Sequence, residues 1–301
     1  MSAVLVGSFT PGSDEWHAAR AKGLGGSEIG AVLGLSPWES RFSLWHRKAG
    51  QIGPVEETPE MEWGTRLEPV ILAKFRESHP ELDFNVANGT FTPKDRPWQI
   101  ANPDLLAAEA VVDAKFSMFG DGWGEPGSDE VPPHVRCQIV WYMDVLQVRF
   151  GHLAVLVGGC DYREYVVEYD PAEAEYLRGE GEQFLLDLAS NVRPDLDAHS
   201  ATYQAVRELH PEIDGTDIEI DTDLAQWYVA ARADLRAAEE REQFARTAIA
   251  DAMGTAKRAR WDDWTIANRQ ARNGGTPYIV AGRKLPDLDA FEQFTNQGAS
   301  L

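Results

Sequence analysis

The chain has 301 residues, 43% of them hydrophobic, and a formal net charge of −21 at pH 7. Its ten Trp, eight Tyr and twelve Phe exclude a disordered chain, and the lack of an apolar run of ~20 residues or of a secretory leader predicts a cytoplasmic protein without a membrane span. The negative charge opposes a polyanionic partner, yet much of it lies in residues 212–223, and a basic N-terminal group leaves room for a local basic channel: Arg20, Lys22, Arg41, Arg47 and Lys48.

Capping residues and apolar periodicity predict four helices toward the N-terminal end. They cover residues 13–22, 27–33, 40–49 and 60–78. Ser13 or Asp14 is the expected N-cap of the first helix. Pro69 lies inside the fourth pattern, so this helix either begins near Thr65 or kinks at the proline.

Short alternating patterns then predict the strands of one meander. These strands cover residues 84–87, 91–92, 98–101, 105–108 and 111–116. An acidic, glycine-rich loop at 120–131 precedes a helix at 132–148. A strand pair, a helix and a long polar stretch follow, at 152–157 with 164–168, at 171–191 and from Pro194 onward.

Pro194 and the polar residues after it indicate a boundary between a core of residues 1–195 and a helical C-terminal extension of residues 196–301. The elements of the core predict an α/β fold with a central mixed β-sheet flanked by helices. A helix at 223–253 dominates the extension, and its apolar side has a three-four spacing that Glu242 interrupts. Such a side packs against the core or against another subunit, and the second case would give a homo-oligomer.

Cys137 and Cys160, the two cysteines, are too few for a four-thiolate zinc or iron–sulfur site. We expect both to be buried and reduced, since the cytoplasm disfavours a disulfide between them. Residues 257–283 are basic and aromatic. This composition fits DNA binding, but the preferred interpretation is a segment that covers the core.

Asp104, Asp113 and Lys115 form the pattern with the clearest chemistry. Asp113 and Lys115 are two apart on a predicted strand and project from one face, and Asp104 precedes Asp113 by nine residues, on the neighbouring strand of a hairpin. Close carboxylates are favourable around a hard cation such as Mg²⁺, and a lysine can orient the attacking water and balance charge on a phosphate. A surface ion pair gives the same pattern, but Glu68 and Gln138, polar residues in apolar helical patterns, are candidates to face the same centre.

The order of longer motifs is more specific than this short pattern. The motifs are Gly-Gly-Ser-Glu-Ile-Gly-Ala-Val-Leu-Gly-Leu-Ser-Pro-Trp (25–38), Trp-Gly-Thr-Arg-Leu-Glu-Pro (63–69), Asn-Pro-Asp (102–104), Val-Asp-Ala-Lys (112–115) and Cys-Gln (137–138). Over roughly residues 13–160 the chain resembles the phage lambda exonuclease and YqaJ-like viral recombinase family of the PD-(D/E)xK nuclease superfamily. The resemblance implies a restriction-endonuclease-like core.

The resemblance also implies a role for each residue of the pattern. The metal ligands would be Asp104, Asp113, Glu68 and the carbonyl of Ala114. The catalytic set would be Lys115, Glu68, Asp104, Asp113 and Gln138. Relatives more often have Glu at position 113, and the shorter Asp moves the carboxylate by roughly 1.5 Å.

Arg20 and Ser27 match the part of the family that anchors a terminal 5′-phosphate of DNA. A guanidinium fork and a hydroxyl near the start of a helix suit an anion. Glu28, which follows Ser27, would oppose a phosphate there unless it is paired.

The resemblance implies an exonuclease that uses Mg²⁺, with Mn²⁺ as a possible substitute, to hydrolyse phosphodiesters at double-stranded DNA ends in the 5′→3′ direction. It would act in phage-type homologous recombination beside a single-strand annealing protein, and relatives often assemble as rings. Two alternatives stay open: an endonuclease of restriction or repair type on the same fold, and a catalytically inactive DNA-binding module. The intact residue pattern argues against the second.

Overall fold

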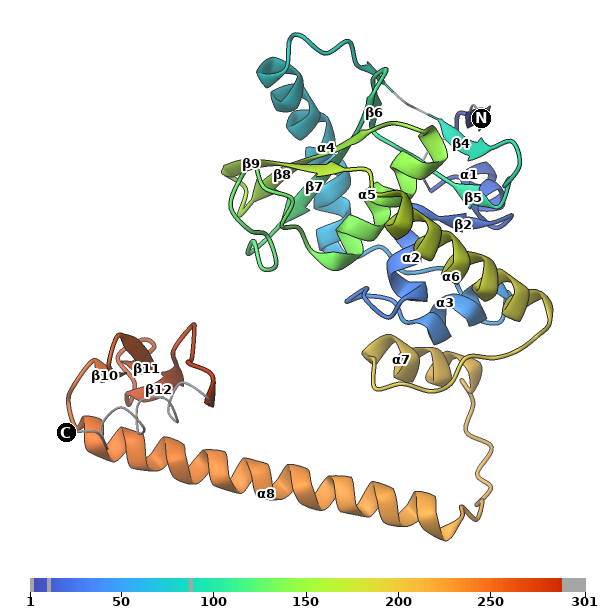
Figure 1. Ribbon diagram of the computed structural model, residues 1–301. Coiled ribbons are helices and arrows are strands. Elements are labelled where there is room, and N and C mark those ends of the chain that lie inside the picture. Colours follow the sequence, from blue (N-terminus) through green and yellow to red (C-terminus); the bar gives the residue numbers. More distant parts are fainter. Residues whose placement is uncertain (1–2, 10–11, 87–88, 289–301) are drawn as a thin grey trace, which may run out of the picture. The chain divides into compact units, whose positions relative to one another are not determined.

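The computed structural model describes residues 3–9, 12–86 and 89–288 (Figure 1). Contacts divide the chain into two compact units, Met1–Ile213 and Asp214–Leu301. The first unit is a mixed α/β structure with several small sheets, and the second contains one long helix and a small sheet.

The five-stranded sheet of the first unit has the strand order β3-β6-β7-β8-β9 (Figure 1). β7 (Ala110–Ser117) and β8 (Phe150–Val157) run parallel, and the other neighbours run antiparallel. The remaining strands are β3 (Asn85–Val86), β6 (Leu105–Leu106) and β9 (Asp161–Glu168). The sheet is therefore mixed, as the sequence predicts.

Only part of the predicted meander forms. β6 and β7 are antiparallel neighbours, and Phe91 and Ala101 of two predicted strands form an antiparallel bridge. However, β4 (Thr90–Pro93) pairs along its length with β1 (Ala3–Gly7), and β5 (Gln99–Ile100) pairs in parallel with β2 (Leu24–Gly25). The prediction of a single meander is wrong because such short strands show too little alternation to specify a partner. Ala87, the end of the first predicted strand, lies outside the described residues.

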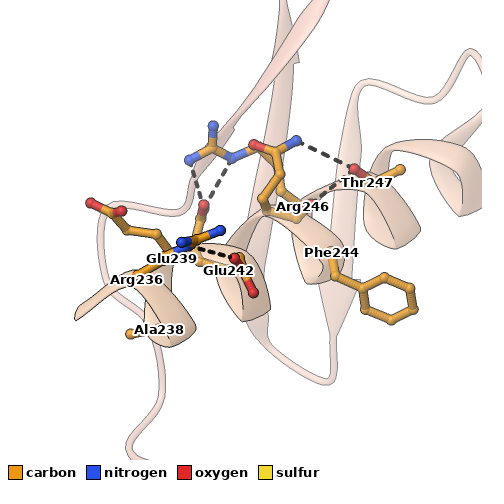
Figure 2. A pocket seen from close by; sticks show the side chains of 9 residues that line it. Arg236, Ala238, Glu239, Glu242, Phe244, Arg246 and Thr247 are labelled. Carbon is orange, nitrogen blue, oxygen red and sulfur yellow. Dashed lines mark hydrogen bonds and ion pairs between the residues drawn. The ribbon is translucent and has the colours of Figure 1, made fainter. Parts of the chain in front are cut away.

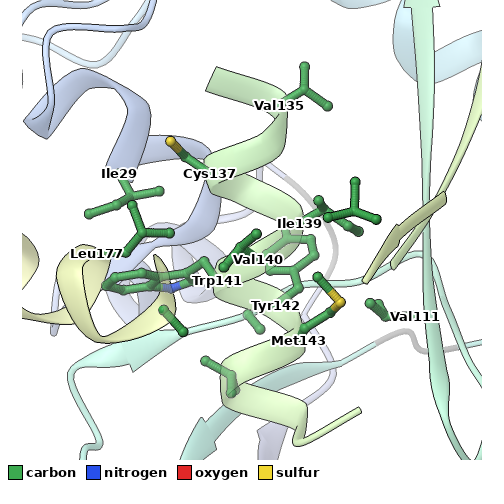
Figure 3. Packing of buried hydrophobic residues seen from close by; sticks show 14 of the residues in the cluster. Ile29, Val111, Val135, Cys137, Ile139, Val140, Trp141, Tyr142, Met143 and Leu177 are labelled. Atoms are coloured by element: carbon green, nitrogen blue, oxygen red, sulfur yellow. The ribbon is translucent and has the colours of Figure 1, made fainter. Parts of the chain in front are cut away.

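Helices pack on both faces of this sheet. α5 (Pro133–Leu146) belongs to the same buried cluster as Val111, and α4 (Pro59–Ser78) packs on Val112. Consecutive strand residues point to opposite faces, so the two helices cover opposite sides of β7. Figure 3 shows α5 at the centre of the larger cluster, where Trp141 is 1% exposed and packs beside the other apolar side chains of this helix.

α4 begins at Pro59, and the hydroxyl of its N-cap Thr58 accepts a hydrogen bond from the amide of Met61. The alternative of a start near Thr65 is therefore wrong. Pro69 lies within the helix and is exposed, so water can bond the carbonyl that the missing proline amide leaves without a helical partner.

α2 (Gly26–Val32) and α6 (Pro171–Ala189) pack on α5, and α3 (Arg41–Lys48) packs on α2 and α6. α1 (Asp14–Arg20) precedes them in the chain. The side chains of Ser13 and Ser40 are the N-caps of α1 and α3. Ser13 is one of the two residues that the sequence predicts as the N-cap of the first helix. The caps explain why these short segments, which would be marginal alone, begin at defined residues.

One helix of the first unit is absent from the sequence prediction. α7 (Ser200–Leu209) packs on α3. The Thr202 hydroxyl donates to the Ser40 hydroxyl at 2.6 Å, and His199 Nε2 lies 3.1 Å from the Ser36 carbonyl oxygen. The contact boundary consequently follows Ile213 rather than residue 195.

The second unit is not wholly helical. α8 (Thr222–Met253) precedes an antiparallel sheet of β10 (Arg258–Trp261), β11 (Trp264–Gln270) and β12 (Tyr278–Ala281). The basic and aromatic segment 257–283 thus forms strands, and the C-terminal end of α8 packs on them through buried Met253.

Both cysteines are free thiols. Cys137 is buried in α5, and burial raises the pKa of its thiol to about 11. Cys160 is exposed in the turn between β8 and β9, so the expectation of burial is wrong for this residue, because no element covers a hairpin turn at the surface.

Within the part of the chain that the structure describes, no helix combines the length and the apolar character that crossing a membrane requires.

Candidate active site

β7 brings Asp113 and Lys115 to one face of the sheet. The first four residues of the strand are buried and the last four are half-buried, so the strand leaves the core just after Asp113. The alternation places both side chains on the same side as Val111, which is the side that α5 covers. Asp113 therefore lies at the floor of the candidate site, and Lys115 lies nearer to solvent.

Asp104 is joined to β7 through the backbone. It precedes β6, the antiparallel neighbour of β7, and its Oδ2 accepts a hydrogen bond from the amide of Ala114 at 2.7 Å. Burial raises the pKa of the Asp104 carboxyl well above its ordinary value, and the negative charges of Asp113 and Glu68 raise it further. These shifts indicate that the three carboxylates lie close enough to repel one another.

Lys115, Asp113 and Gln138 form a closed network. Lys115 Nζ lies 2.5 Å from Asp113 Oδ2 and donates to Gln138 Oε1 at 3.1 Å. The Gln138 amide in turn donates to Asp113 Oδ1 at 3.2 Å. Burial lowers the pKa of the Lys115 ammonium, but the charges of the nearby carboxylates outweigh this effect and hold that pKa above its usual value. The lysine is therefore a cation at neutral pH.

Glu68 comes from α4, on the other side of the sheet, and approaches the same centre. Burial raises the pKa of its carboxyl, as does the charge of Asp113, while Lys115 lowers it. The structure thus brings together every residue that the sequence pattern assigns to the chemistry, with Glu68 and Gln138 supplied by two different helices.

The donor set fits a hard divalent cation. Among the described residues, no group of three or more His, Cys, Asp or Glu is arranged to hold a metal ion. Mg²⁺ usually binds through one or two carboxylates and keeps several waters. The carboxylates of Asp104 and Asp113 are therefore the type and number of ligands that Mg²⁺ requires from a protein. Their mutual repulsion, which raises the pKa of Asp104, is the interaction that a cation between them would relieve.

Arg20 and Ser27 also meet as the sequence predicts. Arg20 Nη2 donates to Ser27 Oγ at 2.9 Å. Glu28 is paired with Arg20 at 3.5 Å and with Lys48 at 3.1 Å, and its carboxylate accepts from the Gly25 amide at 2.6 Å. Burial raises the pKa of Glu28, but the two cations outweigh this effect and lower it. Glu28 is thus a paired anion that caps α2.

Tyr142 connects these two groups and was missed by the sequence analysis. Its hydroxyl accepts from the Gln138 amide at 3.0 Å. Its ring lies against Gly26, where an added Cβ would be 2.6 Å from Tyr142 Cε1. The start of α2, beside Ser27, therefore contacts the residue that supports Gln138. The signal was present in the sequence, because Tyr142 follows Gln138 by four residues and shares its helix face.

Lys48 and His134 were also missed as members of the site. Lys48 lies beside Glu28, and its Nζ donates to the Gly23 carbonyl at 2.8 Å. His134 precedes Gln138 by one helical turn, and burial lowers the pKa of its imidazole, as does the charge of Lys115. The 74%-exposed Trp38 contacts the His134 ring edge-on at 4.9 Å. The site is thus lined by three α5 residues at four-residue intervals.

The chain was compared with known proteins and structures. Residues 15–149 match the YqaJ-like viral recombinase domain. Uncharacterized protein YqaJ of Bacillus subtilis (strain 168) is 26% identical over 226 residues, which are 69% of this chain and 67% of that protein. Protein D345L of African swine fever virus (strain Badajoz 1971 Vero-adapted) is 38% identical over 58 residues, which are 19% of this chain and 17% of the viral protein.

A solved structure, an alkaline exonuclease (LHK-Exo) from Laribacter hongkongensis, aligns with 20% identity and a TM-score of 0.49, covering 60% of this chain and 94% of that chain. The family match contains the whole candidate site, from Arg20 to Gln138 and Tyr142. The match of residues 15–149 to the YqaJ-like viral recombinase domain, together with the similarity to the Bacillus subtilis protein, confirms the resemblance to the phage lambda exonuclease and YqaJ family.

Proposed function

We propose that this protein is a metal-dependent deoxyribonuclease that hydrolyses phosphodiesters at the ends of duplex DNA. The observation that carries the proposal is the network of Asp113, Lys115 and Gln138 beside Asp104 and Glu68, inside the segment that matches a viral recombinase domain. An inactive binding module has no need to hold several like charges together at a cost in stability.

Asp104 and Asp113, with Glu68 and the carbonyl of Ala114, would hold Mg²⁺, and Mn²⁺ could replace it. When bound, the ion supplies a Lewis acid that withdraws electron density from the scissile phosphate and favours ionisation of the attacking water. The protein's own contribution is to fix the carboxylates, through the Ala114 amide for Asp104 and through Gln138 for Asp113.

Lys115 would act as a cation rather than as a base in this arrangement. In the metal-free protein the surrounding carboxylates raise the pKa of the ammonium above its usual value, so Lys115 holds its proton before the ion binds. It can donate a hydrogen bond to the attacking water and offset the negative charge that builds on the phosphate. Gln138 accepts a hydrogen bond from Nζ at 3.1 Å, which holds the lysine beside Asp113.

Arg20 and Ser27 would bind a terminal 5′-phosphate and so direct the enzyme to DNA ends in the 5′→3′ direction. Lys48 keeps Glu28 paired, so Arg20 can turn its guanidinium to a phosphate without leaving a bare carboxylate. Tyr142 contacts Gly26 and accepts a hydrogen bond from Gln138, and this link supports an end-binding group close to the proposed catalytic residues. Cleavage in this direction leaves a 3′ single strand, the substrate of a single-strand annealing partner in phage-type recombination.

Digestion of defined DNA substrates tests the proposal. Linear duplex with a 5′-phosphate should be degraded with Mg²⁺ and not with EDTA, and duplex lacking the phosphate should be degraded more slowly. A covalently closed circle should remain intact, and its digestion would instead establish an endonuclease. Asp113→Asn should abolish degradation, while the matched surface change Asp83→Asn should not. Full activity in Asp113→Asn would refute the assignment of the site.

A further inference from the structure

Helix α8 carries an apolar seam that is exposed along most of its length, with Ile249 half-buried. The seam consists of residues spaced alternately by four and three: Leu224, Tyr228, Ala231, Leu235, Ala238, Glu242, Ala245, Ile249 and Ala252. Its large members are well exposed, with Tyr228 at 65% and Leu235 at 48%. Among the described residues, the small sheet of the second unit contacts α8, and the buried residue of this helix is Met253 at its C-terminal end. A helix of this length with an uncovered three-four seam has the pattern of a coiled-coil strand.

We propose that α8 pairs with α8 of a second copy of this chain as an antiparallel coiled coil. The seam has two classes of position, those reached by a four-residue step and those reached by a three-residue step. In an antiparallel pair, each residue of one class faces a residue of the other class on the partner helix. One class holds Tyr228, Leu235, Glu242 and Ile249, and the other holds Leu224 and alanines. The pairing therefore places Tyr228 on Ala245 of the partner subunit and Leu235 on Ala238 of the partner subunit. Tyr228 and Leu235 each meet an alanine, which allows close packing, and Ile249 meets Leu224 of the partner subunit near the end of the pair.

The charges beside the seam favour the same direction. In the antiparallel register, Arg232 lies opposite Glu239 of the partner subunit, and Asp234 lies opposite Arg241 of the partner subunit. Symmetry repeats both pairs, so four attractive contacts form. All four side chains are exposed on α8. In this register, none of the four is needed for another contact between the two helices.

The parallel arrangement has the opposite electrostatics. It would place Asp234 beside Glu239 of the partner subunit and Arg241 beside Arg246 of the partner subunit, each a like-charge contact. It would also face Glu242 with its own copy in the seam. In the antiparallel register Glu242 faces an alanine instead, and its ion pair with Arg246 in the same helix, at 2.6 Å, can remain.

α8 also carries an open hollow, lined by residues of this helix alone and not by the carboxylates of the candidate active site (Figure 2). Of its lining residues, Ala238 and Glu242 belong to the seam, and the others, Phe244 among them, lie outside it. The proposed pairing therefore rests on the seam and on the charges beside it, not on this hollow.

Disulfide crosslinking of the full-length protein tests both the pairing and its direction. The exposed native thiol is first removed by Cys160→Ser. In that background, the double variant Tyr228→Cys with Ala245→Cys should give a crosslinked dimer on mild oxidation. Tyr228→Cys alone should not, because the two copies of position 228 would be separated by seventeen helical residues, roughly 25 Å. No crosslink in the double variant, or equal crosslinking of Tyr228→Cys alone, would overturn the proposal.

Solution mass and charge variants give an independent readout. Leu235→Lys should halve the mass measured by light scattering, whereas Phe244→Ser, an exposed apolar residue of α8 outside the seam, should not change it. Glu239→Arg should weaken association by roughly tenfold and Arg232→Glu in the same chain should restore it; a parallel pair would tighten with Glu239→Arg. Circular dichroism confirms that each variant keeps its helix. A mass that Leu235→Lys leaves unchanged would show that the seam packs within its own chain or on another partner, which contradicts the proposal.

Discussion

Lys115 has two partners whose removal would have different effects. Asp113 supplies its charge partner at 2.5 Å, and Gln138 supplies only a position, at 3.1 Å. Removing the ammonium should remove the cation that offsets charge on the phosphate, whereas removing Gln138 should leave the cation present but less well placed. The lysine should therefore matter more than the glutamine.

We expect Lys115→Ala to lower kcat/KM for linear duplex by about 10²–10⁴-fold, and Gln138→Ala to lower it by less. Initial rates at saturating Mg²⁺ measure both effects. Lys74→Ala is a matched control, because Lys74 is an exposed α4 lysine whose recorded charge partner is Glu77 on the same helix. Rates for Lys115→Ala within threefold of the parent would contradict the role proposed for the ammonium.

Asp104 offers a test that does not depend on cleavage. Its folded-state pKa is raised, so ionisation of this group costs stability as pH rises from the ordinary carboxyl pKa through the raised value. In metal-free protein at pH 7–8, Asp104→Asn should therefore raise Tm, by about 2–4 °C for each kcal/mol of repulsion removed. The amide oxygen of Asn can still accept from Ala114.

Thermal unfolding with EDTA and with Mg²⁺ measures this effect. Mg²⁺ should raise the Tm of the parent protein and should raise that of Asp104→Asn much less, because one of its ligands is lost. The gain of the variant in EDTA should shrink toward pH 4, where the parent carboxyl is also protonated. Equal Mg²⁺ stabilisation of both proteins would remove Asp104 from the ligand set.

At the scale of elements, α4 connects the candidate site to β9. Its middle brings Glu68 to the site, and its C-cap His79 joins β9, where His79 Nε2 lies 2.7 Å from Glu164 Oε2. Glu164 also accepts from the Tyr162 hydroxyl at 2.8 Å. Burial lowers the pKa of His79, but Glu164 and Glu81 outweigh this effect and raise it above the ordinary value.

This contact should make the docking of α4 dependent on pH. Because the folded-state pKa of His79 is raised, its stabilising effect is complete below the ordinary histidine pKa of about 6.5 and is lost as pH rises through the raised value. We expect His79→Gln to lower Tm by about 2 °C at pH 6 and by much less at pH 9. His210→Gln, a C-cap histidine of α7, is the control. A pH-independent difference would show that the ring stabilises by packing alone.

At the scale of the whole molecule, the two units predict how the chain can be divided. Every residue of the candidate site precedes Ile213, the end of the first unit. A boundary at residue 195 would remove α7, in which Thr202 and Ala205 are buried, and would leave Ser40 without its Thr202 partner. The first unit should therefore tolerate truncation after residue 213 but not after residue 195.

We expect residues 1–213 to unfold cooperatively and to retain cleavage of a short linear duplex. Residues 1–195 should melt at least about 5 °C lower, given one lost buried hydrogen bond and the exposed surface of α3. Calorimetry of the two truncated chains makes the comparison. Equal melting temperatures would place the boundary at residue 195, and loss of cleavage by residues 1–213 would show that the second unit contributes to the activity.

The sequence by itself determined which residues make up the candidate site, because that information is local. Strand alternation puts Asp113 and Lys115 on one face whatever the partner strand, and helix periodicity singles out Glu68 and Gln138 as polar groups in apolar patterns. The Gly-Gly-Ser motif and the order of the blocks that follow were enough to indicate the family. The N-cap at Ser13 and the long helix α8 are local in the same way.

Only the tertiary structure decided what depends on contacts between distant segments. β4 and β5 take β1 and β2 as partners, and a strand of a few residues does not encode that choice. Glu28 is paired with Lys48, twenty residues later in the chain. Lys115 is held by the Gln138 side chain of α5. Its pKa is raised by carboxylates from three segments: β7, the residue before β6, and α4. Local patterns name the groups, but the Coulomb energy among them exists only once the fold has brought them within a few ångströms.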